Sequence, residues 1–343
     1  MVKVSVIGAT GYAGAELMRL LASHKEVEVV HAVSKSFAGQ QLSAIYPSFM
    51  SRDFLLEEMD LGTIAKDSDI VFTCLPHGAS ASAVPALLEG GTCVIDLSGD
   101  FRYRDADVYE AWYKQTHTAK ELLGKSVYGM PELYRDKIAA TKLVGNPGCY
   151  TTCAILALYP LLKNGMIDSH GIIVDAKSGV SGAGRSEKLA NAFCEVNESV
   201  KAYGVGTHRH TSEIEQELSF AANDTVVISF TPHLLPIKRG IISTIYAAPK
   251  AGITDADIAD VYAMYKDEPF VKVSGSTLPE IKHVTGSNNC AIGYVFDKRA
   301  GRLVIVSCLD NLIKGAAGQA VQNMNILCGI DESEGLNNIG WYL

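Results

Sequence analysis

The amino-terminal segment at residues 2–22 reads VKVSVIGATGYAGAELMRLLA and combines three local signals. The run Val2–Gly8 is rich in valine and isoleucine and predicts a buried strand. After the glycines, Ala13, Leu17, Leu20 and Leu21 share one face of a predicted helix. A glycine turn at this place lets the backbone approach a pyrophosphate, and the helix amides favour the anion. Glycine turns join strands to helices in many folds, but this setting favours a dinucleotide site at Gly8, Thr10, Gly11, Tyr12, Ala13 and Gly14.

Strand signals recur along the first half of the chain, with helical stretches between them. They lie at Val27–Val33, Asp69–Leu75 and Cys93–Leu97, and a fifth ends near Gly145. Strands spaced by helices form βαβ units, so we expect an α/β fold with a Rossmann-type parallel sheet.

The strands after Cys149 are longer and predict a second domain. They lie at Gly171–Lys177, Thr225–His233, Gly240–Ala248, Ala291–Asp297 and Leu303–Leu309. The last two flank a turn at 298–302 and predict an antiparallel hairpin. We therefore expect a nucleotide-binding domain at 1–147 and an α+β catalytic and oligomerisation domain with a mixed or antiparallel sheet at 148–310. A helical stretch at Asn311–Leu327, within 311–343, would complete the first domain.

The end of the second strand bears on the choice of nucleotide. NAD sites usually carry Asp or Glu about 20 residues after the glycines, where the carboxylate accepts from the ribose 2′-hydroxyl. Here that place holds Ser34, Lys35 and Ser36, a cation flanked by hydroxyls. This pattern predicts NADP, although a solvated loop would look similar. Pro76, His77 and Gly78 follow another parallel strand and should lie over the cofactor.

Composition excludes several classes of function. The 343 residues include 30 Lys+Arg and 38 Asp+Glu, a net charge of −8 without a basic block, which disfavours nucleic-acid binding. No window approaches 18 uninterrupted apolar residues, so we expect no membrane span. The start MVKVSVIG runs directly into a strand and leaves no room for a signal peptide, so we expect a cytoplasmic protein with reduced cysteines.

Cys149 is the candidate nucleophile. The segment from Val144 to Cys153 runs from a strand through a Pro/Gly turn into a helix, with Cys149 at the start of that helix. Free amides and the helix dipole stabilise a thiolate there. Most cysteines are structural, but a thiolate beside a nicotinamide suggests capture of an activated acyl group as a thioester, followed by hydride transfer. Cys153, one turn later, should be buried and inert.

The segment His208-Arg209-His210 offers the acid–base group. Ser212 and Glu215 fit a capping box, which predicts that a helix begins there and leaves both histidines in a loop. There are two alternatives. The histidines could be hydrogen-bonded loop residues without a catalytic role, or the H-x-H pair could bind a metal. We expect that this chain has no metal site. His210 is the first choice as acid/base, and the residues alone do not separate it from His208.

Polar clusters elsewhere predict contacts to an anionic substrate. A glycine-rich turn carries cations and hydroxyls at 177–185, and Arg102 follows a strand end. Guanidinium and ammonium groups suit phosphate or carboxylate, although solvated surface cations are the alternative. The predicted substrate contacts are Arg102, Asn146, Lys177, Ser178, Gly179 and Arg185.

Several motifs together resemble the N-acetyl-γ-glutamyl-phosphate reductase family, within the wider aspartate-semialdehyde dehydrogenase-like group. They are GATGYAG, GNPGCYTT, KSGVSGAGR, HRHTSEIEQ and DNLIKGAAGQAVQNMN, and the likeness extends over essentially the whole chain. The resemblance implies NADPH-dependent reduction of N-acetylglutamyl 5-phosphate to the semialdehyde, with release of phosphate, in arginine biosynthesis. It implies that Cys149 is the thioacyl nucleophile, that the HRH segment supplies the acid–base group and that Asn311 contacts the nicotinamide half of NADP. Thr151 and Ser212 stand where many relatives have proline, which leaves the nucleophile in place.

Two other functions remain open from the sequence. One is reduction of the one-carbon-longer aminoadipyl phosphate of lysine biosynthesis. The other is a dinucleotide-binding redox sensor without turnover, in which the HRH loop would have no purpose. The resemblance also implies a homo-oligomer, a dimer or a tetramer.

Overall fold

The computed structural model describes residues 1–341 and divides into two compact units. The first unit comprises Met1–Pro147 and Ala316–Asn337, and the second comprises Gly148–Gly315 and the stretch from Asn338 onward. Among residues 1–341, no helix is long and apolar enough to cross a lipid bilayer.

The first unit contains a seven-stranded parallel sheet in the order β3-β2-β1-β4-β5-β7-β6. Its strands are β1 (Val2–Ile7), β2 (Val27–Val33), β3 (Leu56–Glu57), β4 (Ile70–Thr73), β5 (Cys93–Asp96), β6 (Val127–Tyr128) and β7 (Leu143–Gly145). The predicted Rossmann-type sheet is therefore confirmed. The order reverses at β1, which lies between β2 and β4, and ligands of such sheets bind beyond the strand ends at this point.

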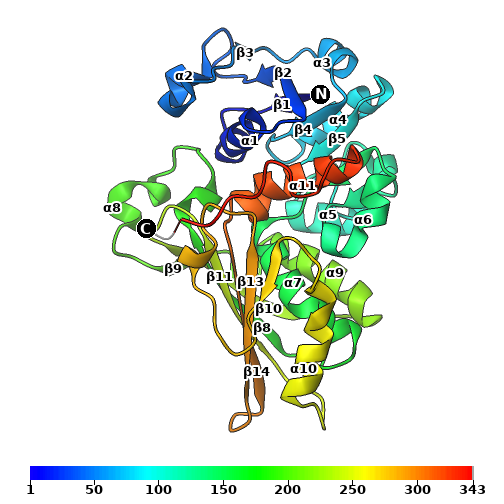
Figure 1. The fold of residues 1–343 in the computed structure, drawn as a ribbon, viewed down its shortest axis with the longest axis vertical. Coiled ribbons are helices and arrows are strands. Elements are labelled where there is room, and N and C mark those ends of the chain that lie inside the picture. The colour runs from blue at the N-terminus through cyan, green and yellow to red at the C-terminus, as the bar shows by residue number, and fades with distance from the viewer. Residues whose placement is uncertain (342–343) are drawn as a thin grey trace. The chain divides into compact units, whose positions relative to one another are not determined.

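Helices cover this sheet. They are α1 (Tyr12–Ala22), α2 (Leu42–Ile45), α3 (Leu61–Asp67), α4 (Ala79–Glu89), α5 (Ala106–Tyr113), α6 (Pro131–Ala139) and α11 (Gly318–Leu327). Val4 and Val6 of β1 are fully buried, as are Leu17 and Leu21 on the predicted apolar face of α1. Figure 1 shows α11 returning, late in the chain, to the elements of the amino-terminal half, where it packs against α1 and α6.

The second unit contains a seven-stranded mixed sheet in the order β12-β13-β14-β11-β8-β10-β9. Its strands are β8 (Ile172–Gly179), β9 (Lys201–Ala202), β10 (Ile228–Leu235), β11 (Ile241–Ala247), β12 (Val271–Val273), β13 (Cys290–Asp297) and β14 (Arg302–Leu309). The pairs β8–β10 and β12–β13 are parallel and the others antiparallel, so the prediction of a mixed or antiparallel sheet is confirmed. The β13–β14 hairpin was predicted with the correct pairing.

One face of the second sheet is covered by helices (Figure 1). They include α7 (Cys149–Lys163), α9 (His210–Ala222) and α10 (Asp255–Tyr262), while the short α8 (Phe193–Val196) lies elsewhere in the unit. Residues of β11 alternate between buried and partly exposed, as expected for a sheet with one covered face. Helix α7 packs against β11 and β14 and is almost wholly buried, so the helix that begins at Cys149 lies in the core of the unit.

Two predicted elements need correction. The strand expected at Thr225–His233 is shifted, since β10 spans Ile228–Leu235. The helix expected from Asn311 begins as a π-helical turn, η7 (Ile313–Ala317), before α11 starts. The Asp310 side chain accepts hydrogen bonds from the backbone amides of Leu312 and Ile313, which holds Asn311 in a turn. The last two residues of the predicted 311–343 extension lie outside the described part of the chain.

Candidate active site

The glycine turn after β1 has the geometry of a close backbone approach. Gly8 has φ +91°, and a Cβ there would lie 2.4 Å from the carbonyl oxygen of Cys74. A Cβ on Gly14 would lie 2.2 Å from the carbonyl oxygen of Gly8, so neither position tolerates a side chain. Helix α1 then begins at Tyr12 without a side-chain cap, which leaves its first amides directed at the turn. A cradle of this kind fits the pyrophosphate of a dinucleotide.

The ends of β1 and β2 are tied together beside this turn. The amides of Gly8 and Ala9 both donate to the carbonyl of Val33, at 2.9 and 3.0 Å. The hydroxyls of Thr10 and Ser34 lie 2.8 Å apart. Lys35 and Ser36 follow as exposed residues. The structure thus brings the predicted 34–36 segment to the glycine turn, and this segment contains no carboxylate that would repel a 2′-phosphate.

The predicted loop at Pro76–Gly78 follows β4, the other neighbour of β1. The Gly78 amide lies 2.9 Å from each carboxylate oxygen of Asp100. The ring of His77 packs edge-on against Tyr113, with 5.0 Å between ring centroids. His77 is therefore a loop residue that packs on an aromatic ring at the carboxyl edge of the parallel sheet, and its predicted contact with a cofactor stays a prediction.

Cys149 is the first residue of α7, in the second unit, and Gly148 is its N-cap. No side chain caps this helix in the usual way. Instead, the fully buried carboxylate of Glu213, from α9, accepts the Gly148 amide at 2.9 Å and the Thr151 hydroxyl at 2.9 Å. Gly315 lies against Cys149, because a Cβ there would come 2.7 Å from Cys149 Cβ. The turn that presents the sulfur is thus held from two sides.

His210 lies directly beside the turn at Gly148 that precedes Cys149. A Cβ on Gly148 would lie 2.4 Å from His210 Nε2, so the imidazole is packed on the backbone that precedes Cys149. The His210 amide donates to His208 Nδ1 at 3.2 Å, and the two rings meet edge-on with 4.8 Å between centroids.

His208 has a different environment. Its ring packs edge-on against Tyr150, Tyr203 and Phe230, with centroid separations of 5.7, 5.6 and 5.3 Å. Burial, with a smaller contribution from the charge of Arg209, lowers the pKa of His208 to about 4. His208 is therefore neutral at physiological pH. It accepts a hydrogen bond from the His210 amide and does not face the turn that precedes Cys149.

Two tyrosines link this histidine cluster to α7. The Tyr203 hydroxyl donates to the Tyr150 hydroxyl at 3.0 Å, and the Tyr150 hydroxyl donates to the carbonyl of His233 at 3.3 Å. Burial raises the pKa of Tyr203 to about 12 and that of Tyr150 well above its ordinary range. Both phenols therefore stay protonated and act as hydrogen-bond donors.

The predicted capping box at Ser212 and Glu215 is wrong. Helix α9 begins at His210, two residues earlier, and no side chain caps it. The Ser212 hydroxyl donates to the Arg209 carbonyl, and the Glu215 carboxylate accepts the amide of Ile228 from β10. Ser212 thus makes a local bond within the first turn of α9, and Glu215 makes a tertiary bond to β10, so neither side chain serves the predicted cap.

The predicted substrate contacts in the first unit support the chain before the nucleophile. Arg102 is buried, and its Nε donates to the carbonyl of Asn146 at 2.6 Å. The Asn146 amide donates to the Ala316 carbonyl, and its oxygen accepts from Asn323 of α11. Both residues therefore shape the Asn146–Pro147 turn.

The predicted polar turn in the second unit gathers around the end of β8. Lys177 forms an ion pair with Asp175 at 2.5 Å, whereas Arg185 is exposed. Ser178 is buried and Gly179 packs closely on the backbone of Arg239. Asn311 donates to the Ser181 hydroxyl and accepts the Gly240 amide, so it lies among these residues within the second unit.

Sequence reasoning missed Glu213, Tyr150, Tyr203 and Gly315. Tyr150 and Glu213 lie within the motifs already singled out, so proximity to Cys149 and His210 was the available signal. Gly315 lies within the motif DNLIKGAAGQAVQNMN, which gives no sign of its contact with Cys149, and nothing local in the sequence marks Tyr203. Within residues 1–341, no group of three or more His, Cys, Asp or Glu side chains is arranged to hold a metal ion.

Two family models match the chain. Residues 3–141 match the semialdehyde dehydrogenase NAD binding domain, and residues 149–311 match the semialdehyde dehydrogenase dimerisation domain. Among solved structures, the chain is similar to aspartate semialdehyde dehydrogenase II of Vibrio cholerae (TM-score 0.74, 18% identity, 96% of this chain and 98% of that one). It is also similar to aspartate semialdehyde dehydrogenase with NADP of Candida albicans (TM-score 0.66, 17% identity, 96% and 98% covered). At this identity the likeness concerns the fold.

Sequence relatives are much nearer. The chain is 53% identical over 344 residues to the N-acetyl-gamma-glutamyl-phosphate reductase of Pelotomaculum thermopropionicum, with 99% of each chain covered. It is 50% identical over 346 residues to the enzyme of that name from Acetivibrio thermocellus, with 100% of each covered. It is 52% identical over 341 residues to the one from Citrifermentans bemidjiense, with 98% of each covered.

Proposed function

The chain belongs to the semialdehyde dehydrogenase family and, within it, to the N-acetyl-γ-glutamyl-phosphate reductases, and from this membership we propose the following reaction and residue roles. The enzyme reduces N-acetyl-L-glutamyl 5-phosphate to N-acetyl-L-glutamate 5-semialdehyde and releases phosphate, a step of arginine biosynthesis. The observation that carries the proposal is Cys149 at the start of α7, with the His210 imidazole against the adjacent Gly148.

Cys149 is the nucleophile of this proposal. Its thiolate, stabilised by the amides and dipole of α7, attacks the acyl carbon of the acyl phosphate. The new C–S bond replaces the C–O bond to phosphate, which leaves with the electron pair. The resulting thioester keeps the acyl group activated while phosphate departs, so the aldehyde oxidation state is reached without passing through a free acid.

His210 is the acid–base group of this proposal. It lies at the nucleophile turn, whereas His208 is held in an aromatic cluster and accepts the His210 amide. His210 accepts the thiol proton before attack. After hydride transfer, it moves the proton needed when the hemithioacetal collapses, the C–S bond breaks and the thiolate is restored. His208 and Glu213 position His210 and the turn that precedes Cys149.

NADP(H) is the proposed cofactor, and when bound it supplies the hydride. The glycine cradle at Gly8 and Gly14 supports a dinucleotide, and the hydroxyl and ammonium groups at residues 34–36 support the 2′-phosphate. The remaining proposed contacts are Thr10, Gly11, Tyr12, Ala13, Pro76, His77, Gly78 and Asn311. The proposed substrate contacts are Arg102, Asn146, Lys177, Ser178, Gly179 and Arg185.

The proposal also covers assembly and location. The second sheet has one face without covering helices, where Ile173 and Val295 are exposed, and this face suits association into a homodimer or homotetramer. All eight cysteines are thiols, which agrees with a reducing cytoplasm.

A turnover assay with two cysteine variants tests the proposed chemistry. The protein is incubated with NADP, phosphate and N-acetylglutamate semialdehyde, and NADPH formation is followed by absorbance. We expect Cys149→Ser to lower kcat/KM by about 10⁴-fold or more, with unchanged affinity for NADP, because a hydroxyl is a far weaker nucleophile than a thiolate. Cys194→Ser, at an exposed thiol, should behave as wild type. Retained turnover in Cys149→Ser would contradict the covalent mechanism, and a higher kcat/KM for the aminoadipyl semialdehyde would reassign the substrate.

A further inference from the structure

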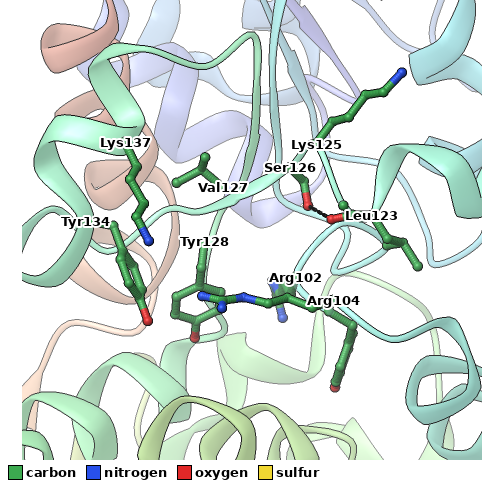
Figure 2. A pocket seen from close by; sticks show the side chains of 11 residues that line it. Arg102, Arg104, Leu123, Lys125, Ser126, Val127, Tyr128, Tyr134 and Lys137 are labelled. Atoms are coloured by element: carbon green, nitrogen blue, oxygen red, sulfur yellow. Dashed lines mark hydrogen bonds between the residues drawn. The ribbon is translucent and has the colours of Figure 1, made fainter. Parts of the chain in front are cut away.

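The first unit contains a cavity of about 300 Å³ that has only Arg102 in common with the proposed substrate contacts. Figure 2 shows it between α6, β6 and the segment that follows β5. Its lining consists of Arg102, Tyr103, Arg104, Leu123, Gly124, Lys125, Ser126, Val127, Tyr128, Tyr134 and Lys137. The glycine turn after β1 contributes nothing to it, so it is separate from the proposed cofactor cradle.

The lining of this cavity is positively charged, whereas the chain as a whole is negatively charged. Arginine and lysine supply four of the lining residues, and no lining residue is Asp or Glu. The whole chain, by contrast, carries 38 acidic against 30 basic residues. A concave surface lined by one sign of charge concentrates counter-ions, so this cavity attracts anions to an otherwise acidic protein.

Arg104 and Lys137 are the cations best placed to meet a bound molecule. In Figure 2 the guanidinium of Arg104 and the ammonium of Lys137 are both directed toward Tyr128 and Tyr134. Lys137 Nζ lies 5.3 Å from the centroid of the Tyr134 ring. Lys125, by contrast, lines the rim with its ammonium directed away from the two tyrosines (Figure 2).

The two tyrosines give the cavity an aromatic wall beside its cations. Their rings meet edge-on, with 6.4 Å between centroids and an interplanar angle of 88°. Aromatic faces pack against carbon, whereas guanidinium and ammonium groups bind phosphate or carboxylate oxygens. Together they suit an organic molecule that carries more than one anionic group.

We propose that this cavity is a binding site for a small organic polyanion, whose phosphate or carboxylate groups bind Arg104 and Lys137 and whose carbon skeleton packs on Tyr128 and Tyr134. Arg102 lies at the inner border of the site. Because its Nε also donates to the carbonyl of Asn146, it links an occupied cavity to the turn that precedes the nucleophile. Arg104, Lys137, Tyr128 and Tyr134 have no role in the proposed reaction, so binding at this site can be tested separately from turnover.

Calorimetric titration of the intact protein at saturating NADP tests the site. Citrate is the organic probe, and inorganic phosphate is the second probe, which separates an organic polyanion from a free inorganic ion. We expect citrate to bind more tightly than phosphate. Arg104→Gln and Lys137→Gln should each weaken citrate binding about fivefold, and the double variant about twentyfold or more, since each removes one positive charge that faces the two tyrosines.

Lys125→Gln is the matched control, because it removes the same charge from the rim without removing an inward-directed ammonium. It should change citrate affinity less than about twofold. Affinity for NADP should be the same in all four variants, which also shows that they are folded. Equal citrate affinity in the wild type and the double variant, or no citrate binding to the wild type at about 20 mM, would overturn the proposal. Neither result bears on turnover through Cys149.

Discussion

At the scale of single residues, the proposed catalytic geometry depends on the absence of a side chain at Gly148. Gly148 precedes Cys149, and a Cβ there would lie 2.4 Å from His210 Nε2. The proposed nucleophile and acid–base group can therefore adopt this arrangement only with glycine at position 148.

The variant Gly148→Ala tests this dependence. Its methyl group would lie 2.4 Å from His210 Nε2, so the imidazole has to move away from the turn. Because displacement of a reacting group by about 1 Å costs on the order of 10²-fold in rate, we expect kcat/KM to fall by that factor. Steady-state kinetics over pH 6–9 measures the effect.

Gly124→Ala is the matched control, because nothing lies within 4 Å of a Cβ at that position. Its kcat/KM should equal that of the wild type. The model of the site fails if both alanine variants have the same activity while their thermal unfolding midpoints are unchanged.

The residues proposed to react have clearer sequence signals than those proposed to position them. Cys149 and His210 stand in sequence motifs whose chemistry is local: a glycine turn at a helix start, and a histidine pair. Glu213 holds the same turn from 65 residues away in the chain, and no local pattern reports a contact of that range. The choice between the two histidines likewise needed the packing of Gly148 on one of them.

At the scale of elements, we expect the carboxyl end of β2 to set the proposed preference for NADP. Ser34 is buried and its hydroxyl lies 2.8 Å from that of Thr10 in the glycine turn. A carboxylate at this place would accept from a ribose 2′-hydroxyl and repel a 2′-phosphate.

We therefore expect Ser34→Asp to lower kcat/KM with NADPH by about 10²-fold while raising the ratio of NADH to NADPH activity. Ser36→Asn, at an exposed position on the same segment, keeps the charge and should leave that ratio within about threefold of the wild type. Parallel kinetics with both nucleotides measures it. An unchanged ratio in Ser34→Asp would mean that this end of β2 does not face the ribose.

Long, strongly patterned elements were predictable and short ones were not. The strand at Val27–Val33 and the β13–β14 hairpin were predictable from the hydrophobic pattern. Their residues alternate between apolar and polar, or form an apolar run, over seven residues or more. Strands β3, β6 and β9 have two residues each and exist only through pairing with a neighbour. The start of α9 was misplaced because Glu215 bonds to β10 instead of capping its own helix.

At the scale of the whole molecule, the histidine cluster makes stability depend on pH. The pKa of His208 is about 4 in the fold, against 6.5 for an unperturbed histidine. Below pH 6.5 the unfolded chain therefore binds a proton that the folded chain does not, so the free energy of unfolding falls as pH falls from 6.5 toward 4.

Comparison with His208→Gln isolates this effect, because glutamine keeps an acceptor for the His210 amide but does not titrate. Between pH 7 and pH 5 the wild type should lose about 2 kcal/mol more of its free energy of unfolding than the variant. Urea denaturation at the two pH values gives the difference. Identical losses in the two proteins would mean that His208 is charged in the folded state.

The division of the chain also belongs to this scale. Residues 316–337 lie in the first unit although the 168 residues before them belong to the second. Inside the first unit, α11 supplies the partner of His24, since Asn325 Oδ1 lies 3.0 Å from His24 Nε2, and Glu332 pairs with Arg135 at 2.9 Å.

This connectivity sets an order of events during synthesis. A ribosome releases the β1–β7 strands early, yet α11 emerges only after residues 148–315 of the second unit have been translated. Until then the nascent amino-terminal half lacks the contacts that α1 and α6 make with α11. We therefore expect a truncation after Pro147 to be less stable and more prone to aggregation than the whole first unit.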